Sequence, residues 1–171
     1  MKQNREDFYF FWKGPFSQWA RFEMEIDKMV YNTCEQFMMA EKAKLFGDVE
    51  IYSKIMKSDS PKKQKELGRQ VKNFDEKKWK EVAREIVFKA NYAKFSQHPH
   101  LRDKLIETRN KIMAEVNPYD CVWGIGLGAD DDRALDVDEW RGTNWLGEVL
   151  MEVRDELKLE KLEMERKNES N

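Results

Sequence analysis

The segment from Asp75 to Gln97 constrains the fold of this chain more than any other. Its apolar side chains recur every three or four residues, which is the spacing of one face of an α-helix. The apolar positions of this face are Trp79, Val82, Ile86, Val87, Ala90 and Ala93. A helix of this length spans a small domain, so other elements must pack against it and we predict a mainly helical fold.

Composition limits the classes of protein that remain. Of the 171 residues, 40% are hydrophobic and six are tryptophan, which excludes a disordered chain and suffices for one domain with its own core. The formal net charge of -2 neither indicates nor excludes a polyanionic partner. Because the sequence has neither a run of about 18 apolar residues nor an N-terminal apolar signal region, we expect a cytoplasmic protein.

Shorter patterns add a small β component. An aromatic run over 8–12 predicts a buried strand, and alternation over 22–26 predicts a second strand that turns near Asp27-Lys28 and returns over 29–31. Further helices are predicted over 34–46, 48–57, 62–71, 99–108 and 144–159, and a strand over 111–116. We therefore predict a single α+β domain, mainly α-helical, over residues 1–160, followed by a frayed tail over 161–171.

The helix predicted over 34–46 carries two charges in an apolar setting. Thr33 and Gln36 form a capping-box pattern at its start, and Gly47 is suited to its end. Glu35 and Lys42 differ in direction by only about 20° and lie roughly 10 Å apart along the axis. They share their face with Met38 and Met39. The wall of a pocket would accommodate both the charges and the methionines, whereas the alternative is a surface helix with solvated charges.

In a pocket, these two side chains form an acid/base and nucleophile set. A carboxylate beside apolar groups has a raised pKa, and a desolvated lysine has a lowered pKa and can attack carbon as the free amine. Cys34 is a lesser candidate for a nucleophile, because no histidine is near it in sequence. Cys34 and Cys121 are both predicted to be free thiols.

A glycine-rich stretch, "CVWGIGLGADDD" at 121–132, is a second candidate. Its glycines could admit backbone N–H groups close to a ligand while Trp123 stacks on a flat ring, although the pattern favours a plain structural turn. Acidic residues follow where a dinucleotide-binding motif would open a helix. Because three successive carboxylates point in different directions, we predict no metal site here. We also expect no cofactor.

Positive charge gathers between residues 57 and 80, where nine Lys or Arg residues face four acidic ones. This stretch could contact phosphate groups of a nucleic acid, or it could be an ordinary solvated helical surface.

Five stretches, taken together, resemble the NADAR (YbiA-like) family over about residues 8–158. They are "FFWKGPFSQW", "YNTCEQFMMAEKAKLFGD", "LGRQVKNFDEKKW", "KFSQHPHLRDKLIET" and "WGIGL…DEWRGTNWLGEVLMEVRDEL". The resemblance implies a mostly helical N-glycosidase fold that cleaves the bond between a ribose C1′ and an exocyclic amine. Its E-x6-K motif falls on Glu35 and Lys42, which it implies are catalytic. Some members carry an acid where this chain has Ile125, so substrate choice could differ.

The resemblance also implies a substrate-binding pocket for ribose phosphates. The matching positions are Trp12, Phe16, Ser17, Tyr31, Asn32, Gly68, Arg69, Trp79, Trp123, Gly124, Gly126, Asn144, Leu146 and Gly147, and Met39 joins them from the face that Glu35 and Lys42 share.

Three functions follow as expectations. The first is removal of ADP-ribose from guanine bases in nucleic acid, above all DNA, which would counteract a DNA-modifying toxin and serve repair or phage defence. The second is hydrolysis of phosphoribosylamino-pyrimidine intermediates of riboflavin synthesis, and the third is a catalytically silent module that binds ADP-ribose. For an enzyme, either Lys42 forms a Schiff base at C1′ while Glu35 moves protons, or Glu35 activates water directly. The expected partner is ADP-ribosylated nucleic acid held by the stretch 57–80, with no role for a membrane.

Overall fold

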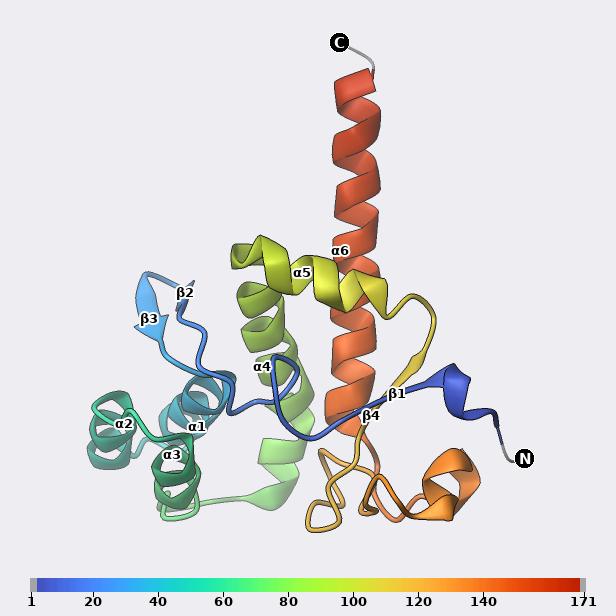
Figure 1. The fold of residues 1–171 in the computed structure, drawn as a ribbon. Helices are drawn as coiled ribbons and strands as arrows, with labels where there is room; N and C mark the ends of the chain where they lie inside the picture. Colours follow the sequence, from blue (N-terminus) through green and yellow to red (C-terminus); the bar gives the residue numbers. More distant parts are fainter. Residues whose placement is uncertain (1–2, 170–171) are drawn as a thin grey trace. The chain divides into compact units, whose positions relative to one another are not determined.

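The computed structural model describes residues 3–169 (Figure 1). Its elements in chain order are the 3-10 helix η1 (Arg5–Asp7), strands β1 (Phe8–Phe11), β2 (Met24–Ile26) and β3 (Met29–Tyr31), helices α1 (Cys34–Leu45), α2 (Val49–Met56), α3 (Pro61–Gly68), α4 (Glu76–Gln97) and α5 (Pro99–Glu107), strand β4 (Ile112–Glu115), the 3-10 helices η2 (Asp132–Leu135) and η3 (Val137–Glu139), and helix α6 (Trp145–Glu169). The predicted α+β, mainly helical fold is confirmed. Among the described helices, none is both long and apolar enough to span a bilayer.

Contacts between residues divide the chain into two compact units. The first unit combines the described residues up to Phe16 with those from His98 onward, and the second is the continuous segment 17–97. Sequence periodicity does not anticipate this division, because it depends on the pairing of two strands that lie far apart in sequence. Each unit is described separately below.

In the first unit, β1 and β4 form a parallel pair with Phe8 opposite Ile112 and Phe11 opposite Glu115. Helix α6 packs against β4 and α5. The buried side chains of Ala114, Val116, Ile125, Leu127 and Ala134 form a core cluster that Phe10 and Trp140 adjoin. The parallel pairing brings the first strand of the chain beside a segment about 100 residues later.

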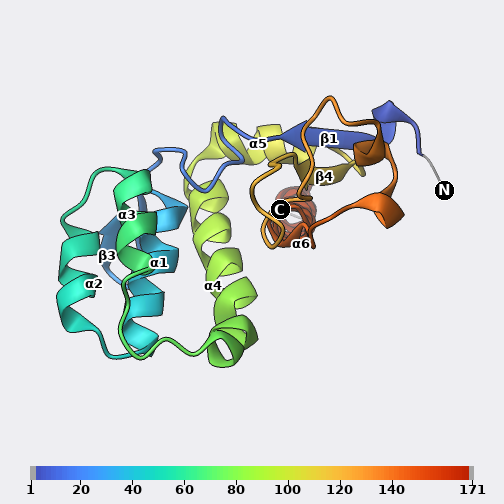
Figure 2. The same cartoon turned by 90° about the horizontal axis from the view of Figure 1, so that it is seen from below.

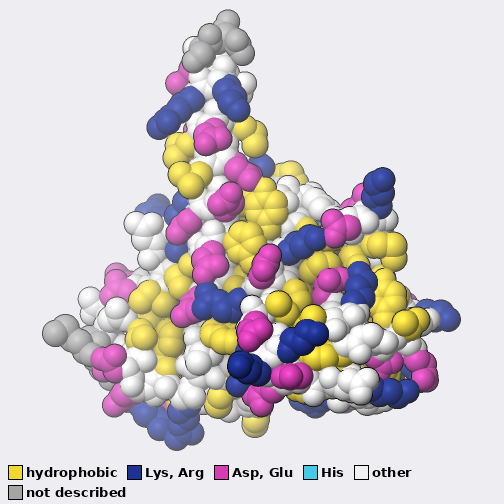
Figure 3. Space-filling model, turned by 180° about the vertical axis from the view of Figure 1, so that it is seen from behind, with side chains coloured by type: hydrophobic (Ala, Val, Ile, Leu, Met, Phe, Trp, Pro, Cys, Tyr) yellow, Lys and Arg dark blue, Asp and Glu magenta, His cyan; other side chains and the backbone are white. Residues whose placement is uncertain are grey.

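Helix α6 is longer than its sequence pattern suggests. The loss of apolar content predicts a helix that ends near Leu159 and a frayed tail over 161–171, but α6 continues to Glu169. Residues 170 and 171 lie outside the described part of the chain. Residues 161–169 are exposed, and Figure 3 shows charged and hydrophobic side chains interspersed along this exposed end of the helix. The segment contains neither glycine nor proline and is rich in strong helix formers, which explains its continuation.

In the second unit, β2 and β3 form the predicted antiparallel hairpin, with Met24 opposite Tyr31. Asp27 and Lys28 form its turn with φ values of 52° and 66°, as a two-residue turn of this kind requires. Helix α1 packs against α2, α3 and α4 (Figure 2). Helix α4 also packs against β2. This arrangement makes α1 the central helix of the unit.

Candidate active site

Hydrogen bonds fix the first turn of α1 to the turn between α2 and α3. The Gln36 N–H donates to Thr33 Oγ1 at 3.0 Å, as the capping pattern predicts. The Gln36 side-chain carbonyl accepts the N–H of Asn32 at 2.8 Å, one residue before the cap. Its amide group donates to the carbonyls of Ile55 and Met56 at 3.1 and 3.3 Å. The start of α1 is therefore anchored to the end of α2.

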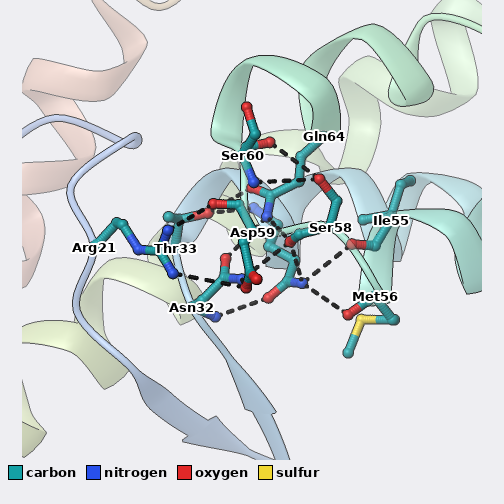
Figure 4. Close-up of polar contacts among 10 residues, drawn as sticks. Arg21, Asn32, Thr33, Ile55, Met56, Ser58, Asp59, Ser60 and Gln64 are labelled. Carbon is teal, nitrogen blue, oxygen red and sulfur yellow. Dashed lines mark hydrogen bonds and ion pairs between the residues drawn. The ribbon is translucent and has the colours of Figure 1, made fainter.

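A second buried amide extends this network (Figure 4). Thr33 Oγ1 donates to Gln64 Oε1 at 2.8 Å, and Gln64 Nε2 donates to Asn32 Oδ1 at 2.9 Å and to the Ser58 carbonyl at 2.7 Å. Asn32 Nδ2 donates in turn to the same carbonyl at 3.1 Å and to Asp59 Oδ1 at 3.3 Å. Asn32, a predicted substrate-binding residue, thus has a structural role in holding the site.

Glu35 lies in this anchored turn and is only 5% exposed. Its backbone N–H donates to the Gln18 carbonyl at 3.1 Å. All seven residues from Cys34 to Ala40 are buried, so α1 is not a solvated surface helix at this end. Of the two sequence interpretations, burial contradicts the surface helix with solvated charges at this end of α1.

Lys42 is half-buried and lies two turns further along α1. Its Nζ is 4.1 Å from the ring centroid of Phe74 and 5.8 Å from that of Trp79. Burial lowers the pKa of this amine, the charge of Glu35 opposes that effect, and the charge of Arg69 lowers the pKa further. The lysine is therefore more readily uncharged than an exposed one. The effects of Glu35 and Arg69 also place both charges within electrostatic reach of the amine.

Sequence reasoning missed Phe74 and Gln18. Phe74 is 44% exposed and contacts Lys42 from the loop that precedes α4. Its signal was an aromatic residue isolated among charges in "KNFDEKKW". Gln18 contributes a backbone carbonyl, which no side-chain pattern reveals.

Two predicted pocket residues bring α1 and α3 together. A Cβ added at Gly68 would collide with the Met39 side chain, so Gly68 permits the close approach of the two helices. Met39 is accordingly buried. Tyr31 is also buried and packs edge-on against Phe37 with ring centroids 5.0 Å apart, and burial raises the pKa of its hydroxyl. These residues support the site from within the second unit.

The other predicted pocket residues lie in the first unit, except Ser17, which begins the second. Phe16 is buried, with its ring edge-on to those of Tyr9 and Phe11. Trp12 is exposed and lies 6.4 Å from Tyr119, ring centroid to centroid. The Trp123 ring meets that of Trp145 edge-on at 5.6 Å.

The glycine-rich loop uses its backbone within the first unit. Ile125 N–H donates to the Glu115 carbonyl at 2.9 Å and Gly126 N–H to the Asp120 carbonyl at 3.1 Å, with Gly126 at φ 69°. The Gly124 carbonyl accepts the N–H of Asn144 at 3.1 Å. The N–H groups of Ile125 and Gly126 are therefore already bonded within the protein and are not available to a ligand. The plain structural turn is the better interpretation of these two positions.

The start of α6 is similarly structural. The Asn144 side chain accepts the Glu115 N–H at 3.1 Å and donates to the Met113 carbonyl at 2.9 Å, which extends the edge of β4. Leu146 is fully buried, and a Cβ added at Gly147 would collide with the Met113 carbonyl. Asn144 and Gly147 thus allow close packing of α6 on β4.

The remaining candidates do not form a site. Asp131 accepts two hydrogen bonds from the Arg133 side chain, which lower the pKa of its carboxyl to about 2. Within residues 3–169, no three His, Cys, Asp or Glu side chains gather as metal ligands would. Both cysteines are free thiols, as predicted. Burial raises the pKa of the Cys34 thiol, which argues against a nucleophilic role.

Comparisons with known proteins agree on one family. The NADAR domain model matches residues 8–158. N-glycosidase R617 of Acanthamoeba polyphaga mimivirus is 45% identical over 126 residues, which cover 74% of each chain. The NMR structure of the Escherichia coli protein YbiA matches with a TM-score of 0.76 and 30% identity, over 95% of this chain and 92% of that one.

One relative is a much longer protein that carries the matched segment as a small part. Riboflavin biosynthesis protein PYRR of Arabidopsis thaliana is 32% identical over 125 residues, which cover 71% of this chain but 18% of that protein. The matched segment is thus a small part of a much longer chain.

Proposed function

This chain belongs to the NADAR domain family and is an N-glycosidase, and we propose that it removes ADP-ribose from guanine bases in DNA by cleaving the bond between ribose C1′ and the exocyclic amine. The observation that carries this proposal is the pair on α1, a buried Glu35 and a half-buried Lys42 whose amine is covered by Phe74. Removal of this modification would restore the base, and so would counteract a toxin that attaches it.

The chemistry of the bond explains why a lysine is useful. A sugar on an exocyclic amine is a glycosylamine, and opening of its ring gives a C1′=N imine. The uncharged Lys42 amine adds to C1′, the base amine leaves with a proton from Glu35, and a C1′=Nζ imine remains on the lysine. Water then adds to C1′, with Glu35 taking its proton, and releases ADP-ribose and the free lysine. Burial of Lys42 supports this route because it lowers the pKa of the attacking amine.

The rival route has no covalent step. Glu35 activates water for attack on an oxocarbenium-like C1′, and Lys42 stabilises charge as the ammonium ion, which its contacts with Phe74 and Trp79 would favour. Borohydride distinguishes the two routes, because it reduces an imine to a stable amine. A substrate-dependent adduct mapped to Lys42 supports the first route, and turnover that borohydride neither traps nor inhibits supports the second.

A basic surface supports a nucleic acid as the carrier of the modified base. Helix α3 and the first turns of α4 expose positive side chains in the same unit as the pair. Lys57, Lys62, Lys63, Arg69, Lys72, Lys77, Lys78 and Lys80 are exposed. Three of them form exposed ion pairs, with Glu66, Glu50 and Glu76, which solvent and salt weaken. Phosphate groups could replace these acids as partners.

The test is to incubate the protein with a DNA oligonucleotide that carries ADP-ribose on guanine and to read the products by mass. We expect free ADP-ribose and restored guanine from the wild type, and none from Glu35→Gln or Lys42→Ala. Lys44→Ala, an exposed lysine of the same helix, is the matched control and should keep activity. Intact substrate after incubation with folded wild-type protein would refute the proposal.

The second candidate is hydrolysis of phosphoribosylamino-pyrimidines, which the Arabidopsis relative's name favours. This substrate needs no polyanion-binding surface. Affinity for a nucleic acid falls steeply as salt rises: the logarithm of the binding constant falls with the logarithm of the salt concentration, with a slope of about 0.9 per phosphate contact. Affinity for a small metabolite does not show this steep fall. A weak salt dependence of KM together with turnover of the pyrimidine would move the assignment to this candidate.

A further inference from the structure

A wholly buried lysine lies on α4 in the same unit as the catalytic pair. Lys94 has no exposed surface, although lysine is almost never fully buried without a partner. It continues the buried face of α4 one turn after Ala90 and Asn91. Burial lowers the pKa of its amine, and the neighbouring Cys34 thiol opposes this effect. An apolar side chain of similar length would avoid the cost of desolvation, so packing alone does not explain a lysine here.

Lys94 and Asn91 together hold one short segment of backbone. Lys94 Nζ donates to the Ser17 carbonyl at 3.3 Å. Asn91 Nδ2 donates to Gln18 Oε1 at 2.8 Å and also to the Val87 carbonyl at 2.9 Å. Ser17 and Gln18 lie in a turn in which the Ala20 N–H also donates to the Ser17 carbonyl at 3.2 Å, and the contacts from α4 tie this turn to the helix.

The held segment contacts Glu35. The Gln18 carbonyl accepts the backbone N–H of Glu35, one of the N–H groups that the first turn of any helix leaves without a partner inside the helix. The adjacent Cys34 Sγ donates to Asn91 Oδ1 at 3.8 Å, and Gln18 Nε2 donates to Met38 Sδ at 4.0 Å. Asn91 of α4 therefore contacts α1 at Cys34, and the segment that α4 holds contacts α1 at Glu35 and Met38.

We propose that Lys94 is a positioning residue for the N-glycosidase reaction: it holds Ser17–Gln18 so that the Gln18 carbonyl fixes the first turn of α1 and aims the Glu35 carboxyl. This inference rests on the proposed role of Glu35. Because Lys94 contacts the backbone of Ser17 and not its side chain, we expect its loss to lower kcat far more than it raises KM.

The experiment has one readout that needs no substrate. Amide hydrogen exchange in Lys94→Met reports the hydrogen bond between Glu35 and Gln18 directly. We expect exchange at the Glu35 amide to become roughly tenfold faster, with α4 amides near Val87 unchanged. Lys89→Met, an exposed position on the same helix whose lysine pairs with Asp27, is the matched control and should change neither readout.

The kinetic readout uses the substrate on which the wild type turns over. We expect Lys94→Met to lower kcat about tenfold with KM within about twofold. In a Glu35→Asp background, the same substitution should cost much less than tenfold, because the two residues act as one unit. Should Lys94→Met not fold, Lys94→Gln, which keeps a shorter N–H donor, takes its place with the same expected directions and smaller effects.

The outcomes are distinguishable. Three results would each overturn the positioning role. They are unchanged exchange at the Glu35 amide, a uniform acceleration of amide exchange through α1 and α4, and a loss of kcat in the double variant with Glu35→Asp that equals the product of the two single losses. Absence of wild-type turnover on both candidate substrates would instead refute the proposed function, while the exchange result would still show whether Lys94 fixes the first turn of α1.

Discussion

Helix α1 in the second unit and the glycine-rich loop in the first each contain a short motif that suggested a binding site. The two differ in what their polar groups contact. In the loop, the N–H groups of Ile125 and Gly126 bond to backbone carbonyls of the same unit. On α1, a carboxylate and an amine are buried or half-buried at the start and near the end of one helix, with aromatic rings over the amine.

The difference shows which kind of motif indicates chemistry. Glycines explained by close backbone approach need no ligand, because removing them would disturb the fold itself. Charged side chains placed where apolar ones would pack better are costly to the fold, so they call for another explanation. The comparison predicts that substitutions on α1 alter turnover, whereas substitutions in the loop alter stability.

The largest expected effect tests α1. Glu35→Gln keeps the shape of the side chain and removes its proton transfer, so kcat should fall by roughly 10³-fold. The free energy of unfolding, measured in urea, should change far less than kcat, because glutamine keeps the size of the side chain and its capacity for hydrogen bonds. A variant that unfolds easily yet keeps its turnover per folded molecule would break the comparison.

The next effect tests the loop region. Gly142 N–H donates to the Ile125 carbonyl, and a Cβ at this residue would collide with the Gly124 carbonyl. Gly142→Ala should therefore lower the free energy of unfolding by roughly 3 kcal/mol, as overpacking against rigid backbone does. Urea unfolding measures the free energy of unfolding. Active-site titration gives turnover per folded molecule, which should change less than about twofold. A large rise in KM with unchanged stability would mean that the loop contacts substrate.

A smaller effect concerns Phe74 above the Lys42 amine. Phe74→Ala admits water, which raises the pKa of Lys42 by reversing its desolvation, while loss of the cation–π contact lowers it by a lesser amount. The acid limb of the pH profile of kcat/KM should move to higher pH, and activity at neutral pH should fall about tenfold. Phe74→Tyr keeps the ring and should behave as the wild type. An acid limb that moves to lower pH would contradict this account.

The smallest effect concerns the pH dependence of stability. Because burial lowers the pKa of Lys94 in the folded state, the unfolded chain binds the extra proton between that pKa and about 10.4. The free energy of unfolding of the wild type should therefore rise with pH through this window, and that of Lys94→Met should lack this rise. Thermal unfolding of both proteins from pH 7 to 10 should show the difference shifting in favour of the wild type. A constant difference would mean that Lys94 is not desolvated.

Much of the fold could be predicted because its signals are local. The three-to-four spacing on α4, the alternation in the β2–β3 hairpin and the cap at Thr33 are each decided by neighbouring residues. The prediction of Glu35 and Lys42 as a pair likewise used only the geometry of one helix face. The same local signals failed for the end of α6, where helix propensity outweighed the loss of apolar residues.

The rest depends on contacts between distant segments. The pairing of β1 with β4 has no local signal, and neither has the placement of Phe74 over Lys42. Lys94 offered a signal that was not used: it continues the spacing of Ala83, Val87 and Ala90, so the helix pattern itself puts a lysine on the buried face. A charged residue in register with an apolar stripe thus marks a position whose residue type packing alone does not explain.

The discontinuous first unit has a consequence for synthesis on the ribosome. Residues 17–97 are made as one stretch, and their helices can assemble as soon as that stretch emerges. Strand β1, although made first, has to wait for β4 and then for α6 before its own unit is complete. The closure of so long a loop slows this last step. During that interval the aromatic strand Phe8–Phe11 is unpaired, so a nascent chain stalled before residue 112 should be the form that chaperones bind most strongly.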